Sequence, residues 1–243
     1  MPDTPQPASN PPEDKAKQKG PRNVAHGDLD KAILEDIQLA AKVGKAAHQV
    51  AIAPKLADEG ITAEEADGVV AEADALKKIS GEVVGLKKSA VTATAREVVA
   101  HKAHLAALRQ IQNLAKRKFP SDKTARANYG IGVPNFGDNR ETLEALSTDI
   151  LTRAATEGFP GNIQAKIAAA TATLGKWKTA DEAQATASSA YSSKLEELKN
   201  RTADLNARRR NIQLAGENIA PVGGKGSASI RRALGLPADR ALA

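Results

Sequence analysis

The chain has no cysteine, and only six of its 243 residues are aromatic. The absence of cysteine excludes a disulfide framework, a thiolate metal site and a cysteine nucleophile. No run of residues approaches the roughly 18 uninterrupted apolar positions that a membrane-spanning helix needs, so we expect no membrane span. With so few rings and 48 alanines, most buried side chains are small. This composition favours helices that pack closely along their length over a thick globular core.

The net charge is small: the chain has 35 Lys and Arg and 29 Asp and Glu, which gives a formal charge of +6. This excess permits an anionic partner without requiring one. The first residues lack the basic and apolar regions of a secretory signal, which leads us to expect a cytoplasmic protein. No constellation of catalytic residues stands out, so we expect neither an enzymatic activity nor a cofactor.

Proline is concentrated at the N-terminus, where residues 1–27 hold six prolines among polar and charged residues. Such a segment cannot bury enough apolar area to offset its ordering entropy, and we predict a disordered tail. From Asp28 apolar residues recur at helical spacing, which predicts a helix over 28–58 with Pro54 near its end and Gly60 after it.

A long helix over 62–118 follows, because Thr62 and Glu65 have the spacing of a capping box and the next proline is Pro120. Within it one apolar row recurs every seven residues, the period of a coiled coil, and we predict this row as the packing seam. The row consists of Val84, Val91, Val98 and Leu105. Three glycines, at positions 68, 81 and 85, either kink this helix or let another backbone approach it.

The second half of the chain repeats this layout. Residues 119–138 have the composition of an ordered loop, a third helix starts at Asp138 or Asn139, and Asn162 begins a fourth that runs to about 217. The fourth helix has the longest regular pattern in the chain, alternating steps of four and three from Ile163 to Ile212. Its members are Ile163, Ile167, Ala170, Leu174, Trp177, Asp181, Gln184, Ser188, Tyr191, Leu195, Leu198, Thr202, Leu205, Arg209 and Ile212.

The two halves align at an offset of 98 residues, so that Gly60 meets Gly158 and Leu76 meets Leu174. This favours an internal repeat of two hairpins, each made of a short and a long helix. Residues 218–243 are rich in glycine and proline and form a flexible tail with a short apolar anchor. We expect this anchor, with Ile230, Leu234 and Leu236, to fold back on its own bundle; the alternative is that it docks on a partner.

Two patterns suggest ligand chemistry. Glu97, His101 and His104 share one helical face and are a candidate metal site, but a polar stripe on a long helix accounts for them better, and we expect no metal. The glycine-rich segments at 130–132 and 223–226 lack the preceding strand that a phosphate-binding loop needs.

Other residues are candidates for binding partners. Tyr129 and Phe136 lie in the ordered loop, which we expect to cap the bundle; the alternative is a docking loop. Basic clusters could bind an anion, although solvated helix faces explain most of them. The candidates are Lys87, Lys88, Arg208, Arg209 and Arg210.

Three short motifs resemble those of uncharacterised all-helical bacterial proteins of about 240 residues. They are Tyr-Gly-Ile-Gly at 129–132, Gly-Phe-Pro-Gly at 158–161 and Leu-Gly-Leu-Pro at 234–237. The resemblance implies an all-helical fold and supplies no activity.

We therefore predict an all-α fold, an elongated antiparallel four-helix bundle of two short-helix/long-helix hairpins with coiled-coil-like packing. The bundle spans 28–217, as a hairpin over 28–118, a loop over 119–138 and a hairpin over 139–217; an open pair of hairpins completed by another chain is the competing arrangement. The expected function is that of a non-enzymatic structural or assembly protein, with itself or another protein as partner. The alternative is a basic helical protein associated with nucleic acid.

Overall fold

A computed structural model describes residues 26–133, 136–137, 139–159 and 161–237. Most of the predicted N-terminal tail, and the last six residues, lie outside this part of the chain. The described residues form helices and no strand, which confirms the all-α class. The helices are α1 (His26–Ala47), α2 (Ala53–Asp58), α3 (Ala63–Lys118), α4 (Lys123–Ala127), α5 (Arg140–Thr156), α6 (Ile163–Ile219) and α7 (Ser227–Ala233).

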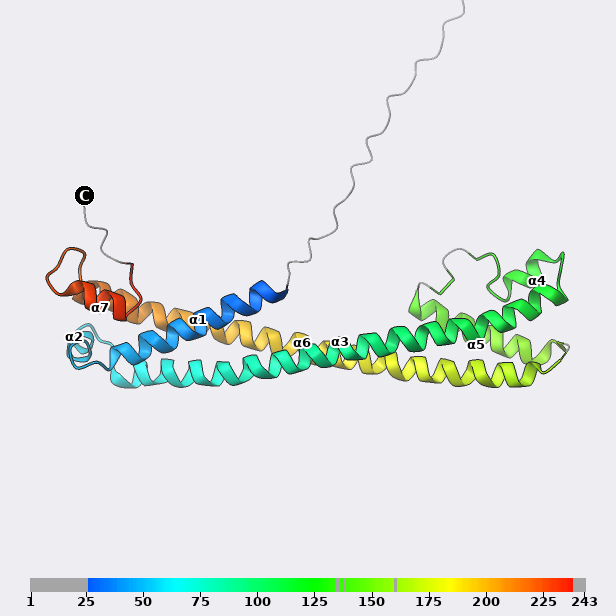
Figure 1. The fold of residues 1–243 in the computed structure, drawn as a ribbon, viewed down its shortest axis with the longest axis horizontal. Helices are drawn as coiled ribbons and strands as arrows, with labels where there is room; N and C mark the ends of the chain where they lie inside the picture. Colours follow the sequence, from blue (N-terminus) through cyan, green and yellow to red (C-terminus); the bar gives the residue numbers. More distant parts are fainter. Residues whose placement is uncertain (1–25, 134–135, 138, 160, 238–243) are drawn as a thin grey trace, which may run out of the picture.

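The two long helices, α3 and α6, run antiparallel side by side along the whole molecule (Figure 1). Polar contacts between them keep one register from end to end. Near one end the Arg201 guanidinium donates to both oxygens of Glu72, over 2.9 and 3.1 Å. Near the other end the Lys166 ammonium lies 3.3 Å from Gln110 Oε1.

Shorter helices cover this pair only near its ends. Helix α1 packs against the first half of α3 and the second half of α6, and α2 and α7 pack at the same end. Helix α5 packs at the opposite end with the loop that precedes it (Figure 1). A bundle of four helices side by side is therefore not confirmed, because α1 and α5 lie at opposite ends of the long pair.

Each end has its own hydrophobic core. The core at the α1 end includes Val83 of α3 and Leu195 of α6, whereas the core at the α5 end includes Leu108 and Trp177. Between them lies a segment that we call the waist, residues 84–99 of α3 and 178–190 of α6, none of which belongs to either core. Only the two long helices form this part of the molecule, except at its α5 end, where Arg140 of α5 contacts Glu97 and Asp181 (Figure 1).

Local signals in the sequence set most helix boundaries. The Glu65 amide donates to Thr62 Oγ1 over 3.1 Å, so Thr62 caps α3 as predicted. Asn139 caps α5 and Asn162 caps α6 in the same way, and Gly60 and Gly158 end the preceding helices at positive φ.

The single helix predicted over 28–58 is wrong. Helix α1 ends at Ala47, and α2 begins at Ala53 with Pro54 in its first turn. Proline has no amide hydrogen and clashes with the carbonyl four residues earlier, so it suits the start of a helix and not its interior. The short helix α4, capped by Asp122, was also missed within the predicted loop.

The two seam predictions had opposite outcomes. Every member of the α6 pattern is buried or half-buried, so that register is confirmed. The seven-residue row of α3 is not the seam toward α6, because Val84, Val91 and Val98 are 58, 64 and 39% exposed. Apart from Leu86, the buried and half-buried residues of α3 at the waist are small or polar, and a search for large apolar side chains overlooks them. They are Lys87, Ala90, Ala93 and Glu97.

Among the described residues, no helix combines the length and the apolar character needed to cross a lipid bilayer.

Candidate functional site

Among Glu97, His101 and His104, the candidate metal ligands, Glu97 and His104 are hydrogen-bonded to other side chains. The His101 ring lies against Trp177, with the ring centroids 5.3 Å apart. The Glu97 carboxylate is 1% exposed and accepts hydrogen bonds from the Trp177 indole at 2.9 Å and from Arg140 at 2.8 Å. Arg140 also contacts Asp181 at 3.2 Å, so this group of charges joins α3, α5 and α6.

His104 is fully buried, and both of its ring nitrogens have partners. Its Nε2 lies 2.8 Å from Ser147 Oγ, and its Nδ1 lies 3.3 Å from Thr173 Oγ1. The ring stacks on Trp177 with a centroid distance of 5.7 Å. Burial, and to a lesser extent the neighbouring His101, lower the pKa of His104, which therefore favours the neutral imidazole.

This polar cluster stabilises the packing of three helices and offers no open coordination site. Glu97 forms charge-assisted bonds with Arg140, and His104 is hydrogen-bonded to hydroxyl groups on two other helices. Within the described ranges no three His, Asp or Glu side chains come together as ligands for a metal ion.

The candidate interaction residues belong to the two cores. Tyr129 is buried, and its ring packs against Phe159 and Phe119 with centroids 5.7 and 6.3 Å away. The half-buried ring of Phe136 lies against Gly130. The loop therefore caps the end of the helix pair, the arrangement that the sequence favoured over a docking loop.

The C-terminal anchor also folds back on its own chain. Helix α7 places Leu234 against Gly216 of α6, where a Cβ would lie 2.5 Å from the leucine side chain. Ile230, Leu234 and Leu236 all belong to the core at the α1 end. The Arg231 guanidinium donates to the carbonyl of Ala220 over 2.9 Å, which ties α7 to the end of α6.

The candidate anion-binding residues do not form one surface. Lys87 and Lys88 lie at the waist, whereas Arg208, Arg209 and Arg210 lie near the C-terminal end of α6, beside α1 and the start of α3. Arg209 is buried, and the Arg208 guanidinium lies over Gly68. The distance along the long pair is about 30 Å at 1.5 Å per residue.

The sequence did not indicate a shallow groove between α3 and α6 at the waist. Two adjoining hollows, each of about 510 Å³, share Thr92, Arg96 and Lys176. We call this surface the basic groove. Its other lining residues are Lys88, Ser89, Ala93, Ala95, Val99, Ala100, Ala103, Thr173, Thr179, Ala180 and Ala183.

A second surface, the valine face, consists of Val84, Val91 and Val98. It belongs to a row on α3 with a seven-residue spacing, and the members of that row on either side of it lie beside other elements. Upstream, Val70 lies against Gly44 of α1, and Lys77 lines a hollow with α1 residues. Downstream, the Leu105 side chain lies against Gly137, in the loop before α5.

No protein-family model, curated protein or solved structure matches this chain.

Proposed function

We propose that the protein is a non-enzymatic assembly protein that pairs with a second copy through the valine face. The observation that carries this proposal is that other parts of the chain pack on one row of α3 side chains at two places and leave the side chains between them exposed. The row is covered by α1 at Val70 and by the loop before α5 at Leu105, but its three central valines are exposed. An aligned set of exposed β-branched side chains is the pattern that helix pairs bury against one another.

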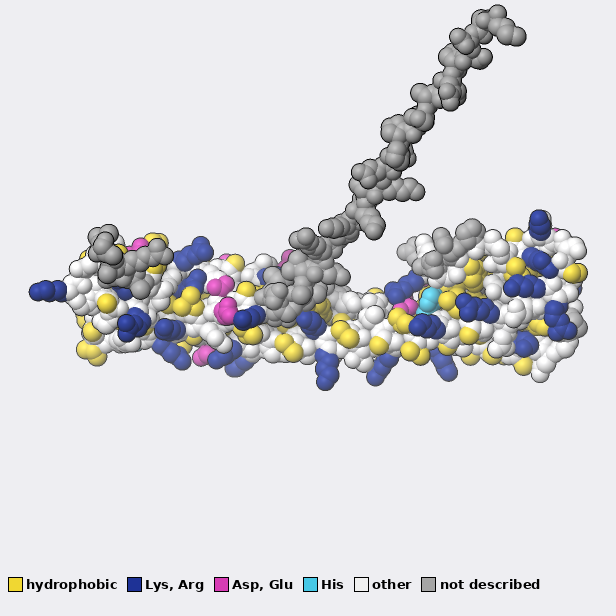
Figure 2. Space-filling view, turned by 45° about the horizontal axis from the view of Figure 1, so that its top comes forward, with side chains coloured by type: hydrophobic (Ala, Val, Ile, Leu, Met, Phe, Trp, Pro, Cys, Tyr) yellow, Lys and Arg dark blue, Asp and Glu magenta, His cyan; other side chains and the backbone are white. Residues whose placement is uncertain are grey.

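The composition of the waist supports self-association. Within it, residues 89–95 of α3 and 183–190 of α6 contain no charged residue, in a chain of which 26% is charged. Hydrophobic atoms are visible along the narrow middle of the molecule (Figure 2). Two waists side by side would form a cross-section of four helices. This is the alternative that the sequence left open, a pair of hairpins completed by another chain.

The first test is the oligomeric state of the full chain by light scattering between about 1 and 200 µM, a range chosen for a small apolar interface. We expect a dimer that dissociates at micromolar concentration. Val91→Glu should give a monomer with unchanged helix content, because it places charges in the interface. Val222→Glu is the matched control, since Val222 is equally exposed, at 65%, but lies beyond α6. A monomer at all concentrations would contradict the proposal.

Nucleic-acid association is the second candidate function, because positive charge is concentrated in one half of the molecule. Residues 83–180 hold fifteen Lys and Arg against seven Asp and Glu, a formal charge of +8 in a chain whose total is +6. Acidic side chains are visible mainly over the α1 half (Figure 2). A duplex DNA shift that weakens steeply between 50 and 200 mM salt would support it. No shift at the lower salt concentration would exclude it.

A further inference from the structure

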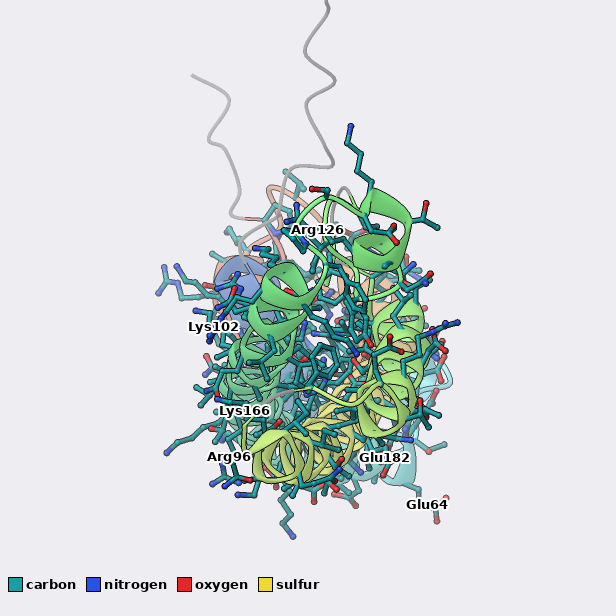
Figure 3. All side chains as sticks on the ribbon, turned by 90° about the vertical axis from the view of Figure 1, so that its right-hand side faces the viewer. Glu64, Arg96, Lys102, Arg126, Lys166 and Glu182 are labelled. Carbon is teal, nitrogen blue, oxygen red and sulfur yellow. The ribbon has the colours of Figure 1, made fainter. Side chains whose placement is uncertain are left out.

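The basic groove lies on a face of the long pair that only α3 and α6 line, and its charge has one sign. None of the residues that line its two hollows is acidic. Seen along the molecule, Arg96, Lys102 and Lys166 lie on one side, and Glu64 and Glu182 lie on the other (Figure 3). Of the nine charged residues in the second half of α3, from 83 to 118, the one acid is the buried Glu97.

The cations at the groove are not used inside the chain. Elsewhere Lys and Arg form ion pairs between helices, as Lys194 does with Glu82 and Arg201 with Glu72. Lys88, Arg96 and Lys176 form no ion pair with any residue in the described part of the chain. Their charge is therefore available to an anionic partner.

The floor of the groove is apolar and flat. Alanine and threonine side chains predominate, and Val99 is 68% exposed. A helix can approach such a floor closely, because the side chains between the two backbones are small. A phosphate backbone, in contrast, gains nothing from alanine, and every aromatic ring of the chain is buried or half-buried, so no exposed ring offers base stacking.

Two glycines extend this surface by two turns. Gly81 and Gly85 precede Ser89 at intervals of four, so they share its face of α3. Both are exposed, and nothing lies within 4 Å of the position of a Cβ at either. Glycine lowers the stability of a helix relative to alanine. Gly44 and Gly216 have a reason within the chain, since Val70 packs against Gly44 and Leu234 against Gly216, whereas Gly81 and Gly85, like Gly175 of α6, have no such neighbour.

We propose that the basic groove, from Gly81 to Ala103, binds one acidic amphipathic helix of another protein. The partner's small apolar face lies on the alanine and glycine floor, and its carboxylates pair with Lys88, Arg96 and Lys176. This site shares no residue with the valine face, although Lys88 and Ala95 adjoin that face at helical spacing. It adds a partner to an assembly protein and does not depend on self-association.

The test measures binding of a labelled synthetic 21-residue helix, with Ala and Leu on one face and Glu on the others, to the full chain at low salt. We expect micromolar binding, and at least about tenfold weaker binding of a scrambled peptide with the same composition, since it lacks the apolar face. Gly85→Leu should raise the melting temperature, because leucine favours the helical conformation more than glycine does. It should also weaken binding at least about tenfold, because the leucine side chain occupies the floor of the groove.

Matched variants separate a local effect from a general one. Gly175 of α6 is also open but lines neither hollow, so Gly175→Leu should raise the melting temperature and leave binding within about twofold. Arg96→Glu should weaken binding at least about tenfold, whereas Lys199→Glu, the same change of charge on an exposed residue outside the groove, should have a small effect.

Three results would overturn the proposal. The first is no binding of the helix at 1 mM, and the second is equal binding of the scrambled peptide. The third is tighter binding of a 20-base-pair duplex DNA that Arg96→Glu abolishes and Gly85→Leu does not change, which would make the surface a polyanion site. Val91→Ser removes an apolar side chain of the valine face without adding a charge beside Lys88, so it should leave helix binding intact. Self-association is measured by light scattering in the absence of the helix, so failure of that proposal is seen separately.

Discussion

Buried polar side chains join the three helices at the α5 end. Glu97 lies between Arg140 of α5 and Trp177 of α6, and His104 lies between Ser147 and Thr173 of the same two helices. Each of these groups loses a strong partner if α5 moves, and an unpaired polar group in this environment costs about 1–3 kcal/mol. The cluster therefore favours one position of α5 on the long pair.

The stability of the protein should fall as the pH decreases below about 6.5, the usual pKa of histidine. The pKa of His104 is lowered in the fold, so the unfolded chain takes up a proton that the folded chain does not. The free energy of unfolding then decreases with falling pH, by at most about 1.4 kcal/mol per pH unit for one proton. Urea denaturation at pH 7.5 and 5.5 measures this effect.

His104→Gln is the control for this prediction, because it removes the titrating group and keeps a hydrogen-bonding side chain. The variant should show a smaller loss of stability between the two pH values than the natural chain. An identical loss in both proteins would assign the pH dependence to groups other than His104.

At the scale of elements, α7 closes the core at the α1 end. Leu234 is fully buried and contacts the α6 backbone at Gly216. Leu234→Ala should lower the free energy of unfolding by about 3 kcal/mol, the typical cost of a cavity left by a buried leucine. Val222→Ala, at an exposed valine of the preceding loop, should change it by less than about 0.5 kcal/mol.

Removal of the chain after Gly226 should also lower the melting temperature, since it deletes all three apolar side chains of the anchor. Unchanged melting with loss of a partner would show instead that α7 leaves the bundle to dock elsewhere. Calorimetry of the full and shortened chains distinguishes the two outcomes.

At the scale of the whole molecule, the waist separates two cores. The area that alanine, serine and threonine can bury between α3 and α6 there is small, so coupling between the ends is weak. We expect Leu76→Ala to speed hydrogen exchange at the α1 end and Leu108→Ala to speed it at the α5 end, each with little effect on the other end. Equal acceleration at both ends by either variant would show a single cooperative unit.

Sequence patterns located the elements well where the signal is local. Thr62 was recognised as a cap, Asn139 was one of two candidates beside Asp138, and the fourth helix was predicted to begin at Asn162, because capping involves residues only three apart. The buried face of α6 was predictable because its residues recur in alternating steps of four and three, and this spacing continues where Gln184 and Ser188 replace apolar residues. Helix α4 was missed because five residues are too few for a period to appear.

The candidate sites depend on contacts that no local pattern contains. The valines at 84, 91 and 98 have the spacing of a seam, but spacing alone does not say which neighbour a face meets; α6 packs on a different face of α3. The basic groove combines residues about 80 positions apart in the chain, Arg96 and Lys176 among them, and neither belongs to a run of like charges.

The sequence by itself therefore determined the helical class, the two long helices and the boundaries set by caps, glycines and prolines, because each depends on interactions within a few residues. Only the tertiary structure decided that α1 and α5 cover opposite ends, that Glu97 and His104 are enclosed by partners, and that the waist keeps an exposed valine face and a basic groove. These features follow from how the two long helices align, and that alignment is set by the sum of many weak contacts along their length.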